Sequence, residues 1–103
     1  MTHTEMKDIK IVIETNALGC ISADVMRIPL AEFTEGVPKI INGVFPPSYM
    51  PYIDTVKVTV KGNTLSVESK YKTETVEMSP YNYITLRDIG LSYAYCNIEI
   101  SAE

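Results

Sequence analysis

The chain has 103 residues, 46% of them hydrophobic and 21% charged, and its formal net charge is −4. This composition is typical of one globular domain, here residues 1–103, with too little interior for a deep pocket or a large cofactor. Direct nucleic-acid binding is not expected of an acidic chain, because neutralised phosphates drive that affinity. The N-terminus has no apolar run behind a basic start, and no segment approaches the ~20 apolar residues of a membrane span. We therefore expect a cytoplasmic protein with no membrane partner.

Two strands are predicted in the first part of the chain, after residues 1–6, which we expect to be frayed. Residues 7–15 alternate between β-branched apolar side chains and polar ones, which is the period of a half-buried strand. A turn over residues 16–19 leads to a weaker second strand, residues 20–28. The short connection makes the second strand a natural partner of the first.

Residues 29–53 hold five of the six prolines and are predicted to be a long Pro-rich loop. Helical spacing in its first part predicts a short helix with Leu30, Phe33 and Val37 on one face. Prolines stiffen the tip of the loop, and a stiff segment loses little entropy on binding. The tip is therefore predicted to be either a packed lid or a pre-shaped binding loop. Its aromatic and methionine side chains are Phe45, Tyr49, Met50 and Tyr52.

The clearest predicted unit is a hairpin over residues 54–72. Gly62-Asn63 places glycine at the first central position of a two-residue turn, where type II′ geometry requires it. That turn sets the register, and the register pairs apolar residues with apolar ones and a lysine with a glutamate. The expected cross-strand pairs are Val60 with Leu65, Thr59 with Ser66, Val58 with Val67, and Lys57 with Glu68.

The last part of the chain is predicted to combine a short helix with a final strand. Residues 73–78 would extend the sheet. Ser79-Pro80 has the form of a helix N-cap followed by proline at the first helical position, and Gly90 would end that helix. Residues 91–101 alternate again, with an apolar face and a face that carries tyrosines.

These elements predict an α+β fold that is mainly antiparallel β. It would contain one sheet of about five or six strands, one or two short helices and the long Pro-rich loop. Runs of strands with little helix between them favour antiparallel pairing, and no long crossover helix is visible.

Sequence motifs for catalysis, cofactors and metals are missing, so no catalytic, cofactor-binding or metal-binding residue is assigned. The one histidine, His3, lies in the frayed N-terminus and is a poor candidate for a base or ligand. Cys20 and Cys96 are expected to be reduced and buried, with a disulfide as the alternative if their strands are neighbours. Glu14 could face Asp24 across the first hairpin, although solvated carboxylates are the simpler interpretation.

The tyrosines suggest a binding surface, because all seven lie between positions 49 and 95 and tyrosine is enriched in protein interfaces. The leading hypothesis is a small non-catalytic protein-binding module of the inhibitor or accessory type. A phage or mobile-element origin is suggested only by analogy of size and acidity. The module would use the stiff loop and the tyrosine face of the last strand. The residues assigned to partner binding are Phe45, Tyr49, Met50, Tyr52, Tyr93 and Tyr95.

Three alternatives stay open. Acidic residues of positions 1–36 could imitate phosphates and occupy the nucleic-acid site of a partner enzyme, which predicts binding that weakens with salt. A small-ligand binder or cofactor-free enzyme would need a pocket lined by tyrosine and aspartate. Self-association into a homo-oligomer could use the tyrosine face or an open sheet edge.

Overall fold

The computed structural model describes residues 6–17, 19–42, 55–69, 72–89 and 95–103. These residues form eight β-strands and one short 3₁₀ turn, and none of them belongs to a helix long and apolar enough to cross a membrane. The elements are β1 (Asp8–Ala17), β2 (Cys20–Pro29), η1 (Leu30–Glu32), β3 (Lys39–Asn42), β4 (Thr55–Lys61), β5 (Thr64–Glu68), β6 (Thr73–Glu77), β7 (Tyr83–Ile89) and β8 (Tyr95–Ala102).

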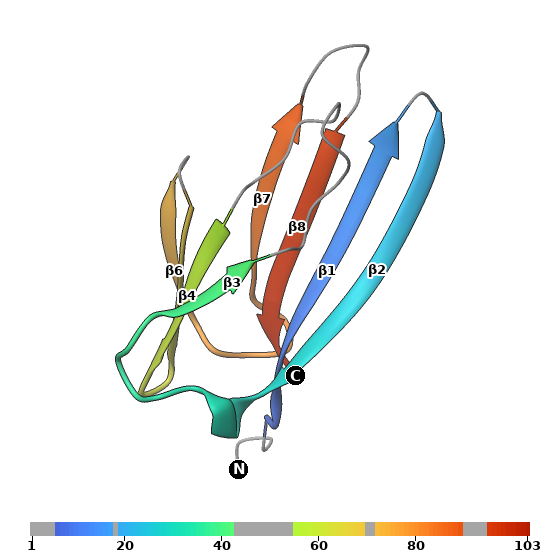
Figure 1. The fold of residues 1–103 in the computed structure, drawn as a ribbon. Helices are drawn as coiled ribbons and strands as arrows, with labels where there is room; N and C mark the ends of the chain where they lie inside the picture. Colours follow the sequence, from blue (N-terminus) through green and yellow to red (C-terminus); the bar gives the residue numbers. More distant parts are fainter. Residues whose placement is uncertain (1–5, 18, 43–54, 70–71, 90–94) are drawn as a thin grey trace.

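The strands form two antiparallel sheets of four strands each (Figure 1). Sheet A has the order β2-β1-β8-β7 and joins both ends of the described chain. Sheet B has the order β3-β4-β5-β6 and is a simple meander. The predicted antiparallel pairing is confirmed, but the predicted single sheet with short helices is wrong. The sequence patterns indicate where strands lie, whereas the division into two sheets depends on the distant pairing of β1 with β8.

One core lies between the inner faces of the two sheets. Alternation along each strand sends every second side chain inward. In sheet A the inward residues line up across strands, as in the row of Ile11, Ile100 and Ile84, which are at most 1% exposed. The buried residues of both sheets form one cluster with Met78, which follows β6. The cluster consists of Ile9, Ile11, Ile13, Ile41, Val56, Val58, Leu65, Val67, Met78, Ile84, Leu86, Cys96, Ile98, Ile100 and Ala102.

The β4–β5 hairpin confirms the predicted register, and all four expected cross-strand pairs are present. Gly62 has a φ of 59°, in the left-handed region that favours glycine. Its N–H donates a hydrogen bond of 2.6 Å to Oε2 of Glu35. The hairpin turn is therefore tied to the segment that precedes β3.

Residues 79–82 form a turn that leads into β7, so the helix predicted from Ser79-Pro80 is wrong. The hydroxyl of Ser79 accepts a hydrogen bond of 3.1 Å from the N–H of Tyr81. Serine thus caps a turn, a role its side chain fills as readily as a helix N-cap. The residues that follow alternate in burial, with Ile84 and Leu86 in the core. This two-residue period agrees with a strand.

The short helix predicted near residue 30 is reduced to η1. Phe33, which follows η1, already has an extended backbone with φ −99° and ψ 134°. Leu30 and Phe33 pack against the core, whereas Val37 is 51% exposed. The three residues therefore do not share a buried helical face, and the prediction is wrong. Gly36, with a φ of 75°, bends the chain before it reaches β3.

Candidate protein-contact surface

β2 lies at the edge of sheet A, as Figure 1 shows for the cyan strand. It is 10 residues long and pairs with β1 without a bulge. Just beyond β2, the N–H of Leu30 donates to the carbonyl oxygen of Lys7 at 2.8 Å. Alternate residues of a strand direct their backbone groups to opposite edges, so the even-numbered residues of β2 bond to β1. The backbone groups that point to the open edge are those of Ile21, Ala23, Val25 and Arg27.

The first half of β2 is uncovered on both faces. All residues from Cys20 to Val25 are exposed, including Ser22 and Asp24, which share the face of the core isoleucines of β1. This half of the strand therefore extends past the cover that sheet B provides. On the outer face, Ile21 is 63% exposed and Val25 is 51% exposed. Two large apolar side chains thus lie beside backbone groups that no described residue pairs.

The outer face of sheet A has an apolar patch next to this edge. Val25 of β2 lies opposite Val12 of β1, and Ala23 lies on the same face as Ile21 and Val25. Residues directly opposite each other on one face are in side-chain contact range. We call these four residues the β2 patch: Val12, Ile21, Ala23 and Val25. An antiparallel sheet normally presents polar residues on its solvent face, so a patch of this kind is a marked feature.

A charge cluster borders the β2 patch at the far end of β2. One carboxylate oxygen of Glu103 accepts a hydrogen bond of 2.7 Å from Nε of Arg27, and the other lies 3.4 Å from Nζ of Lys10. The cluster ties β1 and β2 to the residue that follows β8. The hydrogen bond from Arg27 lowers the pKa of the Glu103 carboxyl below its ordinary value, against a smaller opposing effect of desolvation.

Tyr95 is the assigned binding residue that falls within the described part of the chain. It is half-buried on the outer face of sheet A, where it lies opposite Asn16 of β1. The guanidinium carbon of Arg87 lies 4.9 Å from the centre of its ring, which is a cation–π distance. Asn16 is also opposite Ile21, so Tyr95 lies one strand away from the β2 patch. The remaining assigned residues lie outside the described residues: Phe45, Tyr49, Met50, Tyr52 and Tyr93.

Sequence reasoning misses the β2 patch as a candidate contact surface, although it predicts the strand. The signal is the inverted polarity of the first hairpin. Its turn register puts Asp24 opposite the core residue Ile13, and it puts the apolar Val25 on the face turned to solvent. A polar inner face and an apolar outer face in one half-strand indicate that this half is not covered by the second sheet.

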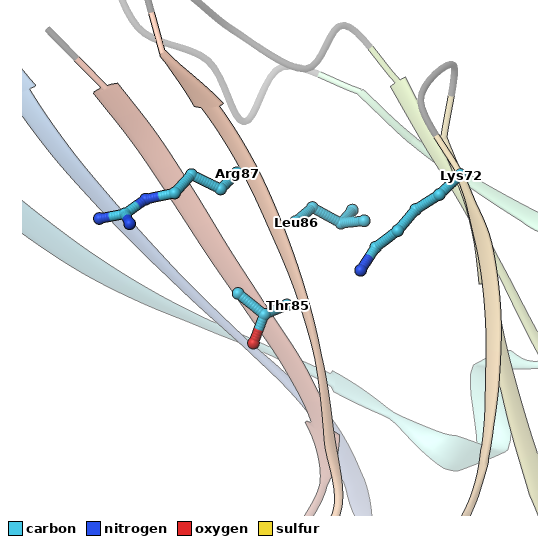
Figure 2. Close-up of a pocket in the computed structure, with 4 residues that line it drawn as sticks. All are labelled: Lys72, Thr85, Leu86 and Arg87. Carbon is cyan, nitrogen blue, oxygen red and sulfur yellow. The ribbon is translucent and has the colours of Figure 1, made fainter. Parts of the chain in front are cut away.

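A groove of about 240 Å³ lies beside β7 and is lined by Lys72, Thr85, Leu86 and Arg87 (Figure 2). Ligand pockets commonly occupy roughly 300–1,000 Å³ and have polar groups that converge. Figure 2 shows Lys72 and Leu86 on one side of β7, and Thr85 and Arg87 directed to the other side. Nζ of Lys72 lies 2.8 Å from Oε1 of Glu74. The groove therefore does not resemble the pocket that the small-ligand alternative needs.

Glu14 and Asp24, considered from the sequence as a possible facing pair, do not come together. Glu14 lies opposite Ala23, and Asp24 lies opposite Ile13, so the two carboxylates occupy opposite faces of the hairpin. Within the described ranges, no three histidine, cysteine, aspartate or glutamate side chains are grouped as metal ligands.

The two cysteines lie in different environments. Cys96 is fully buried on β8, as predicted, whereas Cys20 is exposed at the start of β2, which corrects the prediction that both are buried. β1 separates the two strands, so the thiols are not joined to each other. The exposed position of Cys20 follows from the projection of the β1–β2 hairpin past sheet B.

This geometry defines a two-sheet, antiparallel β domain with an open, partly apolar edge. Comparisons with protein-family models, with curated protein sequences and with solved structures gave no match to this chain. Its function is therefore inferred from the described residues and their chemistry.

Proposed function

We propose that the chain is a small protein-binding module that contacts its partner through the β2 patch and the open edge of β2. The observation that carries this proposal is the exposure of Ile21 and Val25 beside outward-pointing backbone groups. An unblocked edge strand with apolar side chains is a template for pairing with another chain. Strand addition combines main-chain hydrogen bonds, which supply affinity, with side-chain contacts, which supply specificity.

The distribution of polar groups around the β2 patch supports the same function. Protein interfaces commonly have an apolar centre and a polar rim. Here Glu14 lies beside Ala23 on the neighbouring strand, and Lys10 and Arg27 lie beyond Val25. A partner could therefore bury the apolar centre while these charged side chains stay hydrated.

The arrangement of the acidic residues gives less support to the alternative of a nucleic-acid mimic. A phosphate mimic needs carboxylates in a row on one surface. Glu14 lies on the outer face of sheet A and Asp24 on the inner face, while Glu35 is engaged with the N–H of Gly62. These carboxylates point in different directions, so they do not reproduce a phosphate backbone.

The proposal includes a reducing, cytoplasmic setting, in line with the sequence prediction. An exposed thiol such as that of Cys20 is stable where thiols are kept reduced. An inhibitor or accessory role, of the kind found among phage and mobile-element proteins, belongs to the proposal by analogy of size and acidity.

The experiment compares partner binding of two variants that each remove exposed apolar side chains. Ile21→Ser/Val25→Ser removes the centre of the β2 patch. Ile40→Ser is the matched control, because Ile40 is 56% exposed on β3, at the edge of the other sheet. Proteins captured from the source cells are identified, purified and titrated against each variant. Binding lost with the β2 variant and retained with the Ile40 variant supports the proposal. Equal binding by both variants refutes it.

A further inference from the structure

The β2 edge is suited to one particular partner, and this inference rests on the proposed protein-binding function. We propose that β2 pairs in antiparallel orientation with β2 of a second copy of this chain. The twofold axis that relates the two copies would lie between their Ala23 residues. The two A sheets would then form one continuous sheet. A twofold interface uses the same surface of both subunits, so the strand must be complementary to itself.

β2 is the edge strand best suited to pairing. It has 10 residues, whereas β3 has 4, β6 has 5 and β7 has 7. Natural edge strands are blocked by short length, lysines, prolines, bulges or inward-pointing charges, and of these devices the first half of β2 has one, the inward-facing Asp24. Residues 20–26 contain no lysine and no proline, and their pairing with β1 has no bulge. Pro29, at the end of β2, is one of the odd-numbered residues whose backbone groups point to the open edge. Its missing N–H therefore removes no hydrogen bond to β1.

Pairing about Ala23 matches the strand to itself. Residues directly opposite in an antiparallel pair lie on the same face, so the outer face of one copy meets the outer face of the other. Ile21 of one protomer would lie opposite Val25 of its partner, with the two Ala23 residues between these contacts. On the inner face, the hydroxyl of Ser22 would lie opposite the carboxylate of Asp24 and could donate a hydrogen bond to it. The five exposed residues from Ile21 to Val25 thus each gain a compatible neighbour.

Neighbouring registers fit less well. A twofold axis at Asp24 would place two carboxylates directly opposite each other, and like charges in that position are destabilising. An axis at Val25 would place Ile21 opposite Pro29 and Ala23 opposite Arg27. Arg27 is already bound to Glu103 on its own subunit. Among the axes at Ala23, Asp24 and Val25, the axis at Ala23 therefore pairs apolar with apolar residues and keeps the charges apart.

The expected dimer is weak, because one strand edge is a small interface. Such contacts fall at the low end of interface areas, and a dissociation constant on the order of micromolar or weaker is expected. The pairing would merge the two β2 patches and cover Ile21 and Val25 of both copies.

Disulfide trapping tests the register on the purified full chain. The background variant is Cys20→Ser, which removes the exposed native thiol and keeps the buried Cys96. Because the backbone groups of Ala23 point to the open edge, the Ala23 residues of the two copies would form a hydrogen-bonded pair across the axis. The expected distance between their Cα atoms is about 5.5 Å, which a disulfide can bridge. We expect Ala23→Cys to form a covalent dimer under mild oxidation. Ile40→Cys, exposed on the other sheet, measures random collision.

Mixed variants provide a second reading of the register. Ile21→Cys alone and Val25→Cys alone should cross-link no better than the collision control, whereas an equal mixture of the two should form the mixed dimer. Without any added cysteine, light scattering over a concentration series should show reversible dimerisation. Ala23→Lys should abolish that dimer, because two lysines would meet at the axis.

The outcomes separate this inference from the proposed function. If Ala23→Cys cross-links no better than Ile40→Cys and light scattering shows a monomer, the self-pairing is refuted. The protein-binding function still stands in that case if Ile21→Ser/Val25→Ser loses a captured partner. If self-pairing is found and no other protein binds, the β2 edge serves a second copy alone. If neither occurs, both proposals are wrong.

Discussion

Replacing Ile100 by alanine should destabilise the domain by about 3–4 kcal/mol. Ile100 is 0% exposed on β8 and lies between Ile11 and Ile84 in a row across sheet A. The substitution removes three carbons, and loss of their burial accounts for about 2.4 kcal/mol at about 0.8 kcal/mol per methylene. The cavity left between the neighbouring isoleucines adds to this loss, within the range of about 2–5 kcal/mol measured for such changes. This is a large part of the roughly 5–15 kcal/mol by which domains are stable.

Urea unfolding followed by far-UV circular dichroism measures this loss, and the chain has no tryptophan to serve as a fluorescence probe. The midpoint should fall by roughly 1–4 M at a slope of about 1–3 kcal/mol/M. Ile40→Ala is the matched control, because Ile40 is 56% exposed and should lose no more than about 0.5 kcal/mol. If Ile100→Ala unfolds with the same free energy as Ile40→Ala, β8 does not lie at the centre of the core as described.

Three further results follow from the described contacts. Gly62→Ala should destabilise the domain by roughly 1–2 kcal/mol in urea unfolding, because a side chain is unfavourable at a φ of 59°; unchanged stability would contradict this backbone geometry. The carboxyl of Glu103 should titrate below its ordinary value of 4.5 in an NMR pH series, and Arg27→Gln should raise its pKa toward that value. Since folding lowers the pKa of Glu103, the contribution of this carboxyl to stability is fully present above its ordinary pKa. That contribution is lost as the pH falls through the pKa of the folded state. A Glu103 pKa unaffected by Arg27→Gln would exclude the described pairing. Cys20 should react at once with a thiol reagent in the native protein, whereas Cys96 should react only on unfolding, and equal rates would contradict their different burial.

The parts of the fold that depend on nearby residues are predictable from the sequence. The β4–β5 register follows from Gly62 and from alternation on both sides of it, and the structure agrees pair by pair. β1 and β2 also appear where alternation predicts them. A two-residue turn links β4 to β5, so the register of that hairpin can be counted outward from the turn.

Features that depend on distant residues are not predictable in the same way. The pairing of β1 with β8 joins the two ends of the described chain. The sequence of neither strand indicates which other strand it pairs with. Without that pairing, a division into two sheets cannot be told from a single sheet. The helix assigned after Ser79 fails for a different reason. A serine–proline start is compatible with a turn, and the alternation of Ile84 and Leu86 with polar neighbours is the better guide.

The difference between features set by nearby residues and features set by distant residues also decides how much of the candidate surface is predictable. Tyrosine content points to recognition, but of the assigned residues only Tyr95 lies in the described part, where Arg87 covers its ring. The sequence does not indicate that Ile21 and Val25 are exposed, because apolar residues in a strand are expected to face a core. Ile21 and Val25 lie on the outer face of sheet A, which points away from sheet B. Which face of β2 is the outer one depends on how the two sheets assemble.

The separation of β1 from β8 has a consequence for the order in which the protein can assemble during synthesis. Sheet B is a meander of consecutive strands, so each of its pairings can form soon after its strands leave the ribosome. Ile13 of β1, by contrast, waits for Ile98 of β8, and synthesis of the intervening chain takes roughly 4–17 s at about 5–20 residues per second. Throughout that interval the inner isoleucines of β1 have no β8 to pack beside, and both edges of the first hairpin are open. A nascent chain paused before β8 is thus the stage most vulnerable to chaperone capture or aggregation.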